Sequence, residues 1–267
     1  MEYEFEVVRG VKLNIYDSGA GDKNIVFIHG MPGQISNWKH QIGFFEENYR
    51  VIAYDQRGYG CSEKPLKVTF DDYILDLKEL LEKRGVDPGK TVLVGHSFGG
   101  MVAAGFAGRF GVWKLVLIGA VLEIKPTLLD KILWLLPAGV RKQLLYKSNP
   151  LTRRFYRSLF FSRKAPDEVF EEFLRDNAEY IESLPPHVID YDRILAGSSV
   201  VDEASRISCE TLVLTGAEDK ICPPDYARRI AGVIRNSKLI VIEDAGHLVM
   251  YEKPGLVNKL IKEFIES

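Results

Sequence analysis

The sequence feature that most constrains the fold is a glycine-rich turn at residues 95–99, Gly-His-Ser-Phe-Gly. It follows a β-branched apolar run at 91–94, typical of a strand buried on both faces, and precedes a proline-free helical segment at 98–110. In so sharp a reversal the central residue is strained, and side chains two positions to either side would clash. The turn therefore predicts that Ser97 is exposed at the carboxyl edge of a sheet, as in the G-x-S-x-G pattern. A plain turn with Ser97 as a helix N-cap is the alternative.

The rest of the chain alternates strand-like and helix-like segments, and its 267 residues suit one large α/β domain. A hairpin is expected at 3–8 and 11–16, and buried strands at 24–28, 50–54, 91–94, 115–118, 211–215 and 239–242. Helices are expected from Ser36, from Thr69 or Asp71, over 98–110, over 225–235 and over 254–265. This order predicts a mostly parallel sheet covered by helices on both faces.

The interval between the strands at 115–118 and 211–215 is much longer than the dozen or so residues that a crossover needs. We therefore expect a helical lid insertion over residues 121–199, with the core domain formed by residues 1–120 and 200–267. A leucine-rich helix is predicted at 126–136. Because it is apolar around most of its circumference, it either packs between other elements or offers a face to a ligand.

The charge balance gives no reason to expect nucleic acid as a partner, because the 35 Lys and Arg residues are balanced in number by 37 Asp and Glu residues. Within the lid, residues 141–164 carry eight basic side chains and no acid, whereas residues 167–182 carry seven acids and one base. The basic stretch could serve an anionic substrate or a membrane surface. We favour pairing between two neighbouring lid helices, since the adjacent acidic stretch cancels the field.

Cysteine usage and the first residues indicate the compartment. Cys61, Cys209 and Cys222 are scattered without metal-ligand spacing, which suits a reducing environment and predicts no metal site. The acidic, alternating start of the chain is unlike a signal peptide, and no apolar run is long enough to span a membrane. We expect a cytoplasmic protein that needs no cofactor and is a monomer or homodimer.

Two residues could activate Ser97, because a serine hydroxyl needs a base and a third group to orient that base. After such a turn the expected order is serine, then an acid, then histidine. Asp219 follows the strand at 211–215 and His247 follows the last strand, so both belong to the same sheet edge as Ser97. Glu218, Glu123 and Asp244 are the alternative acids.

The negative charge that develops on an attacked carbonyl oxygen needs preorganised donors. The N–H of Phe98 begins the helix after Ser97, and the N–H of Met31 lies in the loop after an earlier strand. Gly30 allows the backbone of that loop to approach closely. These two N–H groups are the predicted oxyanion hole.

These motifs resemble the α/β-hydrolase fold family, in its small esterase, proline-iminopeptidase and carbon–carbon-hydrolase branches. The resemblance spans the whole chain and rests on residues 29–33, 55–62, 95–100, 216–219 and 246–247. It implies an eight-stranded sheet with one antiparallel edge strand, Ser97 as nucleophile, His247 as base, and Asp219 as its orienting acid. It also implies Met31 and Phe98 as oxyanion donors, and Asp55 and Arg57 as residues that brace a loop.

The resulting hypothesis is a cofactor-free serine esterase acting on a small-molecule ester with an apolar, short to medium acyl chain. Its pocket is predicted to be lined by Gly30, Trp38, Leu129, Leu133, Leu136 and Leu248. A proline-iminopeptidase-like aminopeptidase, a carbon–carbon hydrolase and a small-molecule receptor on a hydrolase scaffold remain alternatives. The aminopeptidase would need lid acids, such as Glu172, Asp176 and Glu179, to hold a free amine.

Overall fold

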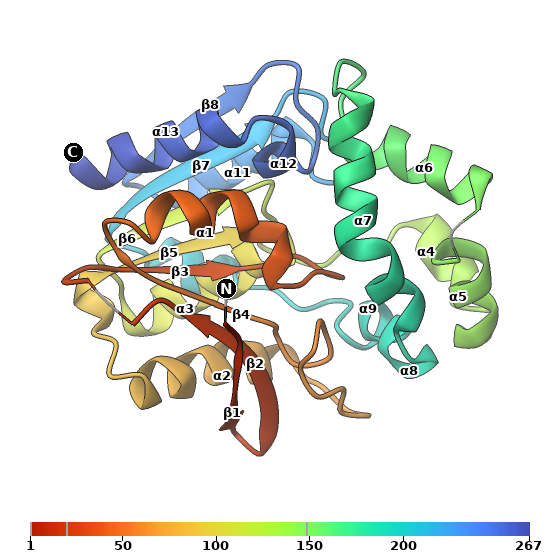
Figure 1. The fold of residues 1–267 in the computed structure, drawn as a ribbon, viewed down its shortest axis with the longest axis horizontal. Coiled ribbons are helices and arrows are strands. Elements are labelled where there is room, and N and C mark those ends of the chain that lie inside the picture. The colour runs from red at the N-terminus through yellow and green to blue at the C-terminus, as the bar shows by residue number, and fades with distance from the viewer. Residues whose placement is uncertain (1, 20, 148) are drawn as a thin grey trace.

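The computed structural model of the protein describes residues 2–19, 21–147 and 149–267. Its strands form one eight-stranded sheet in the order β1-β2-β4-β3-β5-β6-β7-β8 (Figure 1). The strands are β1 Glu4–Val8, β2 Val11–Asp17, β3 Asn24–Ile28, β4 Arg50–Tyr54, β5 Thr91–His96, β6 Lys114–Ile118, β7 Glu210–Gly216 and β8 Ser237–Ile242. The mostly parallel α/β sheet predicted from the sequence is confirmed.

The hairpin of β1 and β2 closes one side of the sheet. β2 pairs antiparallel with both β1 and β4, and every other pair is parallel. The strand that runs against the others is therefore β2, one place in from the edge. The expectation of an antiparallel edge strand was wrong in this detail, because β1 folds back along the outer side of β2.

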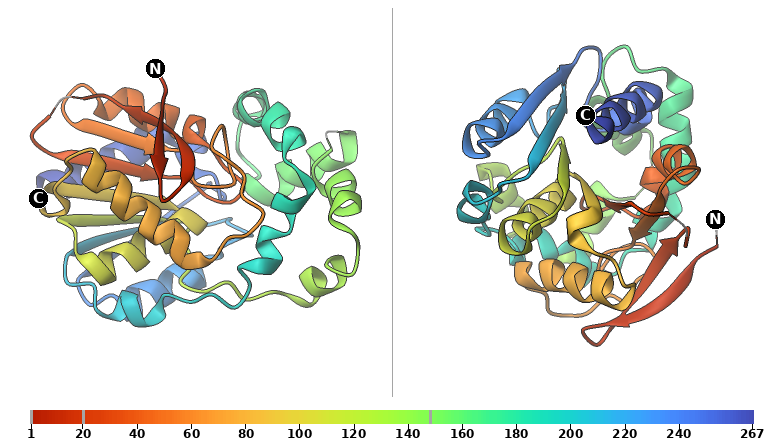
Figure 2. Two further views of the ribbon diagram at one scale, coloured as in Figure 1. Left: turned by 90° about the horizontal axis from the view of Figure 1, so that it is seen from below. Right: turned by 90° about the vertical axis from the view of Figure 1, so that its left-hand side faces the viewer.

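Helices cover both faces of the sheet, as Figures 1 and 2 show. Packed against one another on one face are α1 Lys39–Phe45, α12 Val249–Glu252 and α13 Pro254–Glu266. On the other face lie α2 Phe70–Lys83, α3 Phe98–Phe110, α10 Val201–Ser205 and α11 Pro224–Val233, with the short 3-10 turn η2 Pro88–Lys90 preceding β5. Two apolar cores result, one on each side of the sheet. No helix in the described part of the chain combines the length and the apolar character needed to cross a membrane.

Most helix limits follow the predicted capping signals. Thr69 caps α2, accepting a hydrogen bond from the N–H of Asp72. The helix expected from Ser36 instead begins at Lys39, after a 3-10 turn, η1 Ile35–Trp38. Ser36 lies inside this turn, so the prediction that it caps the helix was wrong.

The segment between β6 and β7 is helical and lies to one side of the sheet (Figure 1). It contains α4 Leu128–Leu133, α5 Ala138–Leu145, α6 Pro150–Phe160, α7 Asp167–Ser183, α8 Pro186–Ile189 and α9 Tyr191–Ile194. Its two ends lie side by side, joined by a bridge between Glu123 and Ser199 and by a hydrogen bond from the N–H of Val200 to the carbonyl of Leu122. These contacts fall at the predicted limits of the lid, and its role as a lid stays a prediction.

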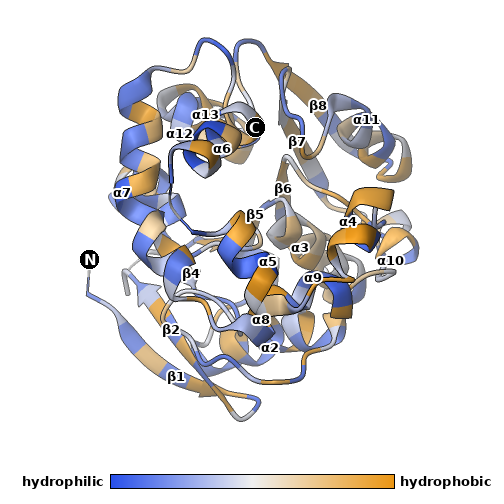
Figure 3. Ribbon diagram, turned by 90° about the vertical axis from the view of Figure 1, so that its right-hand side faces the viewer, coloured by the Kyte–Doolittle hydropathy of each residue, from blue (hydrophilic) through white to orange (hydrophobic). Residues whose placement is uncertain are grey.

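The leucine-rich helix of the lid is shorter than expected and largely uncovered. α4 ends at Leu133, short of the predicted Leu136, which Pro137 disfavours as a helical residue. Leu128 and Leu135 are 75% and 82% exposed. Figure 3, which views the molecule from the lid side, shows α4 as an apolar element facing outward.

α7 is the lid helix that is tied most firmly to the core. Lys39 at the start of α1 forms ion pairs with Glu172 at 2.7 Å and with Asp176 at 2.6 Å. The side-chain amide of Asn37 donates to Asn177 at 2.8 Å. Two acids of the lid's acidic stretch thus pair with the core.

The lid helices α6 and α7 do pair with each other as well. Arg153 of α6 forms an ion pair with Glu171 of α7 at 2.5 Å, and Arg157 approaches Asp167 at 3.8 Å. The favoured interpretation of the lid charges, pairing between neighbouring helices, therefore holds for part of the acidic stretch only.

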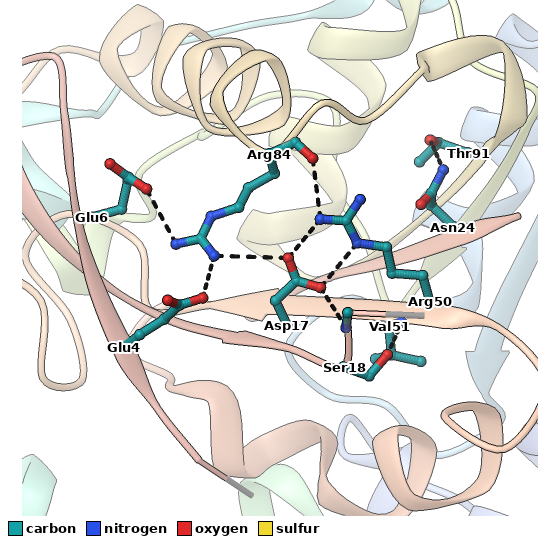
Figure 4. Close-up of polar contacts among 10 residues, drawn as sticks. Glu4, Glu6, Asp17, Ser18, Asn24, Arg50, Val51, Arg84 and Thr91 are labelled. Atoms are coloured by element: carbon teal, nitrogen blue, oxygen red, sulfur yellow. Dashed lines mark hydrogen bonds and ion pairs between the residues drawn. The ribbon is translucent and has the colours of Figure 1, made fainter. Parts of the chain in front are cut away.

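A second polar cluster fastens the hairpin to the sheet and to α2. Asp17 at the end of β2 accepts hydrogen bonds from the Arg50 guanidinium at 3.0 and 2.7 Å, as Figure 4 shows. Arg84, just after α2, donates to Glu6 at 3.2 Å and also pairs with Glu4. Burial alone would raise the pKa of the Asp17 carboxyl, but the hydrogen bonds from Arg50 and Gly19 outweigh it and leave this pKa below its ordinary value.

Candidate active site

Ser97 lies at the turn between β5 and α3 with φ of 53° and ψ of −118°, a strained conformation for a residue with a side chain. A Cβ added at Gly95 would lie 2.4 Å from the carbonyl oxygen of Gly99, and one at Gly99 would lie 2.3 Å from that of Ile28. The positions two residues before and after Ser97 therefore have room only for glycine. Ser97 occupies the N-cap position, yet its side chain makes no capping hydrogen bond. Its hydroxyl is thus not used as a cap.

Asp219 and His247 come together beyond the carboxyl ends of β7 and β8. Nδ1 of His247 lies 2.9 Å from Oδ2 of Asp219, and both side chains are almost fully buried. The other carboxylate oxygen, Oδ1, accepts hydrogen bonds from the N–H groups of Ile221 at 2.9 Å and Cys222 at 2.8 Å. The loop thereby fixes the carboxylate, and its free oxygen is directed at the imidazole.

The alternative acids lie elsewhere. Glu218 accepts a hydrogen bond from the N–H of Arg163, Glu123 forms an ion pair with Lys125, and Asp244 forms one with Lys164. Of the four candidate acids, Asp219 is therefore the one that the structure brings to His247.

His96 links the serine turn to the catalytic candidate His247, a contact that sequence reasoning missed. The two imidazole rings lie 4.5 Å apart between centroids, and Nε2 of His96 lies 3.0 Å from the carbonyl oxygen of His247. Since a carbonyl only accepts, Nε2 carries the proton and donates it. Burial, followed by the nearby charge of His247, holds the pKa of His96 well below its usual value. His96 is therefore a neutral donor that positions the backbone of His247.

The loop after β3 reaches the serine from the other side. A Cβ at Gly30 would lie 3.1 Å from Cβ of Ser97, so the backbone of this loop passes directly against the serine. His29 braces the loop: its Nε2 accepts the N–H of Gln56 at 2.9 Å, and its Nδ1 donates to the carbonyl of Gly30 at 2.7 Å. Because Phe98 is the first residue of α3, its N–H has no partner within the helix.

Asp55 and Arg57 brace the neighbouring loop after β4. Asp55 accepts hydrogen bonds from the N–H groups of Ile35 at 2.7 Å and Cys61 at 2.8 Å, which ties two loops of this sheet edge together. Arg57 binds Asp76 of α2 through two hydrogen bonds, at 2.6 and 2.5 Å. Both side chains are engaged in structural contacts.

The residues predicted to line the pocket differ widely in exposure. Trp38 is fully buried, with its ring against Phe27 and edge-on to His96, so it supports the site from within the core. Leu129 is 63% and Leu136 38% exposed, and Leu133 is half-buried, so these leucines do not form the wall of an enclosed pocket here. α4 turns much of its apolar surface outward, and the role of these leucines in binding substrate stays a prediction.

The lid instead contacts the site through the end of α6. The Phe160 ring lies 6.0 Å from the His247 imidazole between centroids, and its carbonyl accepts the N–H of Leu248 at 3.2 Å. Leu248 is therefore next to the site and is buried, and its role in binding substrate stays a prediction. Phe160 was not foreseen. The only hint was its place at the end of an amphipathic lid segment.

Cys222 is a third residue near the site that sequence reasoning missed, after His96 and Phe160. Its thiol sulfur, a ring nitrogen of His247 and a carboxylate oxygen of Asp219 all lie within 4.8 Å of one another. Its position three residues after Asp219, in the same loop, is the signal that could have indicated this. Burial, and then the charge of Asp219, raise the pKa of this thiol well above its usual value, so it is protonated at neutral pH.

Comparison with known proteins agrees with this architecture. Residues 23–254 match the family described as the alpha/beta hydrolase fold. The chain therefore belongs to that family.

Individual relatives match it along nearly their whole length. It is 29% identical to the AB hydrolase superfamily protein YisY of Bacillus subtilis, with 96% of each chain covered. It is 30% identical to a putative non-heme chloroperoxidase of Synechocystis, with 95% of each covered. Among solved structures, a thermophilic esterase from Thermogutta terrifontis superimposes with a TM-score of 0.84 at 26% identity, covering 100% of this chain and 98% of that one.

Proposed function

We propose that the protein is a serine hydrolase that cleaves carboxylic esters of small molecules through an acyl-enzyme intermediate. The observation that carries the proposal is the hydrogen bond between His247 and Asp219. It forms at the same sheet edge as Ser97, whose backbone is strained and whose hydroxyl makes no capping hydrogen bond. A base held by a carboxylate at the same sheet edge as a serine hydroxyl is the arrangement that nucleophilic acyl transfer needs.

In the proposed mechanism, His247 takes the proton of Ser97 Oγ, and the resulting alkoxide attacks the ester carbonyl. The N–H groups of Met31 and Phe98 stabilise the oxyanion. The protonated His247 then gives its proton to the leaving alcohol, and afterwards removes a proton from the water that releases the acid. Asp219 keeps Nδ1 protonated throughout, so that Nε2 is the nitrogen that exchanges protons with Ser97. None of these steps requires a cofactor.

One observation argues against the aminopeptidase alternative. Two of the lid acids that could hold a free amine, Glu172 and Asp176, already share the ammonium group of Lys39, and the Tyr251 hydroxyl donates to Asp176 at 3.0 Å. An incoming amine would have to displace these contacts. The similarity to the Thermogutta esterase also favours ester substrates.

The direct test is to assay p-nitrophenyl esters of increasing acyl length beside a panel of amino-acid anilides. We expect turnover of the esters and little turnover of the anilides. Dominant cleavage of anilides would favour the aminopeptidase. Binding of esters without turnover would favour a receptor. A vinylogous diketone, added as a third substrate, tests the carbon–carbon hydrolase.

A further inference from the structure

Cys222 gives the candidate active site a third kind of ligand atom. The residue is 3% exposed, and its backbone N–H donates to Asp219 Oδ1. Its sulfur lies within 4.8 Å of both the carboxylate of Asp219 and the imidazole of His247. In the described part of the chain, this is the one group of three His, Cys, Asp or Glu residues found close enough together to hold a metal ion.

The three donor atoms match the preferences of a soft or borderline cation. Thiolate and imidazole bind Zn²⁺ and similar ions, whereas Mg²⁺ and Ca²⁺ prefer sites made of oxygen. Zn–ligand bonds of about 2.0–2.3 Å in a tetrahedral site place the donor atoms roughly 3.4–3.8 Å apart. The observed spacing, at most 4.8 Å, exceeds this by up to about 1.4 Å, which a shift of the Cys222 side chain toward the other two ligands would close.

We propose that Cys222, His247 and Asp219 form a binding site for a soft divalent cation such as Zn²⁺ or Cd²⁺, and that the bound ion inhibits the enzyme. As the metal–sulfur bond forms, the thiol proton passes to solvent. The ion takes the place of the Nδ1 proton between His247 and Asp219, and that proton moves to Nε2, so His247 no longer serves as the base. The inhibition rests on the proposed hydrolase function, whereas the binding does not.

The other two cysteines provide the controls. Cys61 is exposed and Cys209 is half-buried, and neither belongs to the group around His247. An exposed thiol binds Cd²⁺ by itself, so the reference protein carries Cys61→Ser. Cys222→Val in that background replaces the thiol with a side chain of similar size that cannot ligate. Cys222→Ser is a second variant, which keeps a polar group but lacks the soft sulfur.

Binding is measured first, by titrating each full-length protein with Cd²⁺ and recording the ultraviolet charge-transfer absorbance of cadmium–thiolate bonds. We expect a saturable band in the Cys61→Ser reference that is lost in both Cys222 variants. Circular dichroism reports whether each variant is folded. A reference protein without the band, or a band that survives the loss of Cys222, would overturn the site whether or not the protein hydrolyses esters.

Inhibition is measured on the same proteins with a p-nitrophenyl ester. We expect Zn²⁺ to inhibit the reference reversibly, with recovery on adding a chelator, and Mg²⁺ to have no effect. Loss of Cys222 should raise the half-inhibitory Zn²⁺ concentration at least about tenfold, the ratio that corresponds to about 1.4 kcal/mol of binding. Equal Zn²⁺ sensitivity with and without Cys222 would contradict the proposal. Absence of ester turnover in every protein would instead refute the proposed function. The cadmium titration would then still test the metal site, because it does not depend on turnover.

Discussion

His247 Nδ1 lies 2.9 Å from Asp219 Oδ2, and the other oxygen of the carboxylate is held by two backbone N–H groups of its own loop. The carboxylate therefore cannot turn away without losing three hydrogen bonds. This arrangement fixes the imidazole tautomer whose Nε2 is free to accept a proton.

Replacing this acid should impair the enzyme more than replacing any neighbouring acid. Asp219→Asn offers His247 an amide, which favours the wrong tautomer, and the corresponding loss in a well-studied triad is about 10⁴ in turnover. We expect a loss of at least about a hundredfold here, measured as kcat on an ester. The matched controls are Glu218→Gln and Glu123→Gln, whose carboxylates are engaged with Arg163 and Lys125. A larger loss in either control would show that the acid has been assigned to the wrong strand.

Chain-length preference should depend on Phe160 more than on the leucines of α4. Phe160 lies against His247, so Phe160→Ala opens space beside the reacting carbonyl. We expect the preferred ester to become longer by a few methylenes, each worth about 1–3 kcal/mol in an apolar pocket. Leu133→Trp tests the earlier expectation that the leucine stripe sets chain length. If Leu133→Trp shortens the preferred chain and Phe160→Ala leaves it unchanged, the leucines line the pocket after all.

Lys39 should hold α7 against the core. It forms two ion pairs with α7, and because these groups are about a quarter exposed, each pair contributes at most about 1 kcal/mol. Lys39→Met should therefore accelerate amide hydrogen exchange in α7 roughly threefold to tenfold, with no change in α3. Lys259→Met removes an exposed pair within α13 and is the control. Unchanged exchange in α7 would mean that its apolar contacts alone hold it.

The stability contributed by Asp17 should depend on pH. The folded-state pKa of this carboxyl lies below its ordinary value, so its contribution is present above the unfolded pKa of about 3.9 and is lost as pH falls through the folded pKa. Asp17→Asn should cost about 1–3 kcal/mol of unfolding free energy at pH 7, and this cost should shrink below about pH 4. Denaturant unfolding at several pH values measures it, with the exposed Asp22→Asn as control. A cost that stays constant down to pH 3 would exclude the Arg50 contact as its source.

The features that could be predicted from the sequence are mainly those whose determinants lie within a few residues of each other. The turn at Ser97 could be predicted because its glycines act on backbone within a few residues, and the capping of α2 by Thr69 is similarly local. The mostly parallel sheet could be predicted from the alternation of strands and helices along the chain. Asp219 and His247 could be placed because the carboxyl ends of parallel strands share one edge.

Contacts that depend on packing between distant segments could not be predicted. Trp38 is a large aromatic residue of the kind that often lines a pocket. The 3-10 turn nevertheless directs its ring into the core. The α4 leucines have helical spacing, which does not tell which face is covered. Phe160 meets His247 only because the lid returns to the site at the end of α6.

The central claim, that Ser97 is the nucleophile of a serine hydrolase, is tested most directly by a fluorophosphonate probe with identification of the modified residue by mass spectrometry. We predict stoichiometric modification of Ser97 in the native protein. We predict no modification of a folded Ser97→Ala variant, whose ester turnover should fall by far more than tenfold. Modification at another residue, or turnover by Ser97→Ala within tenfold of the native protein, would contradict the account.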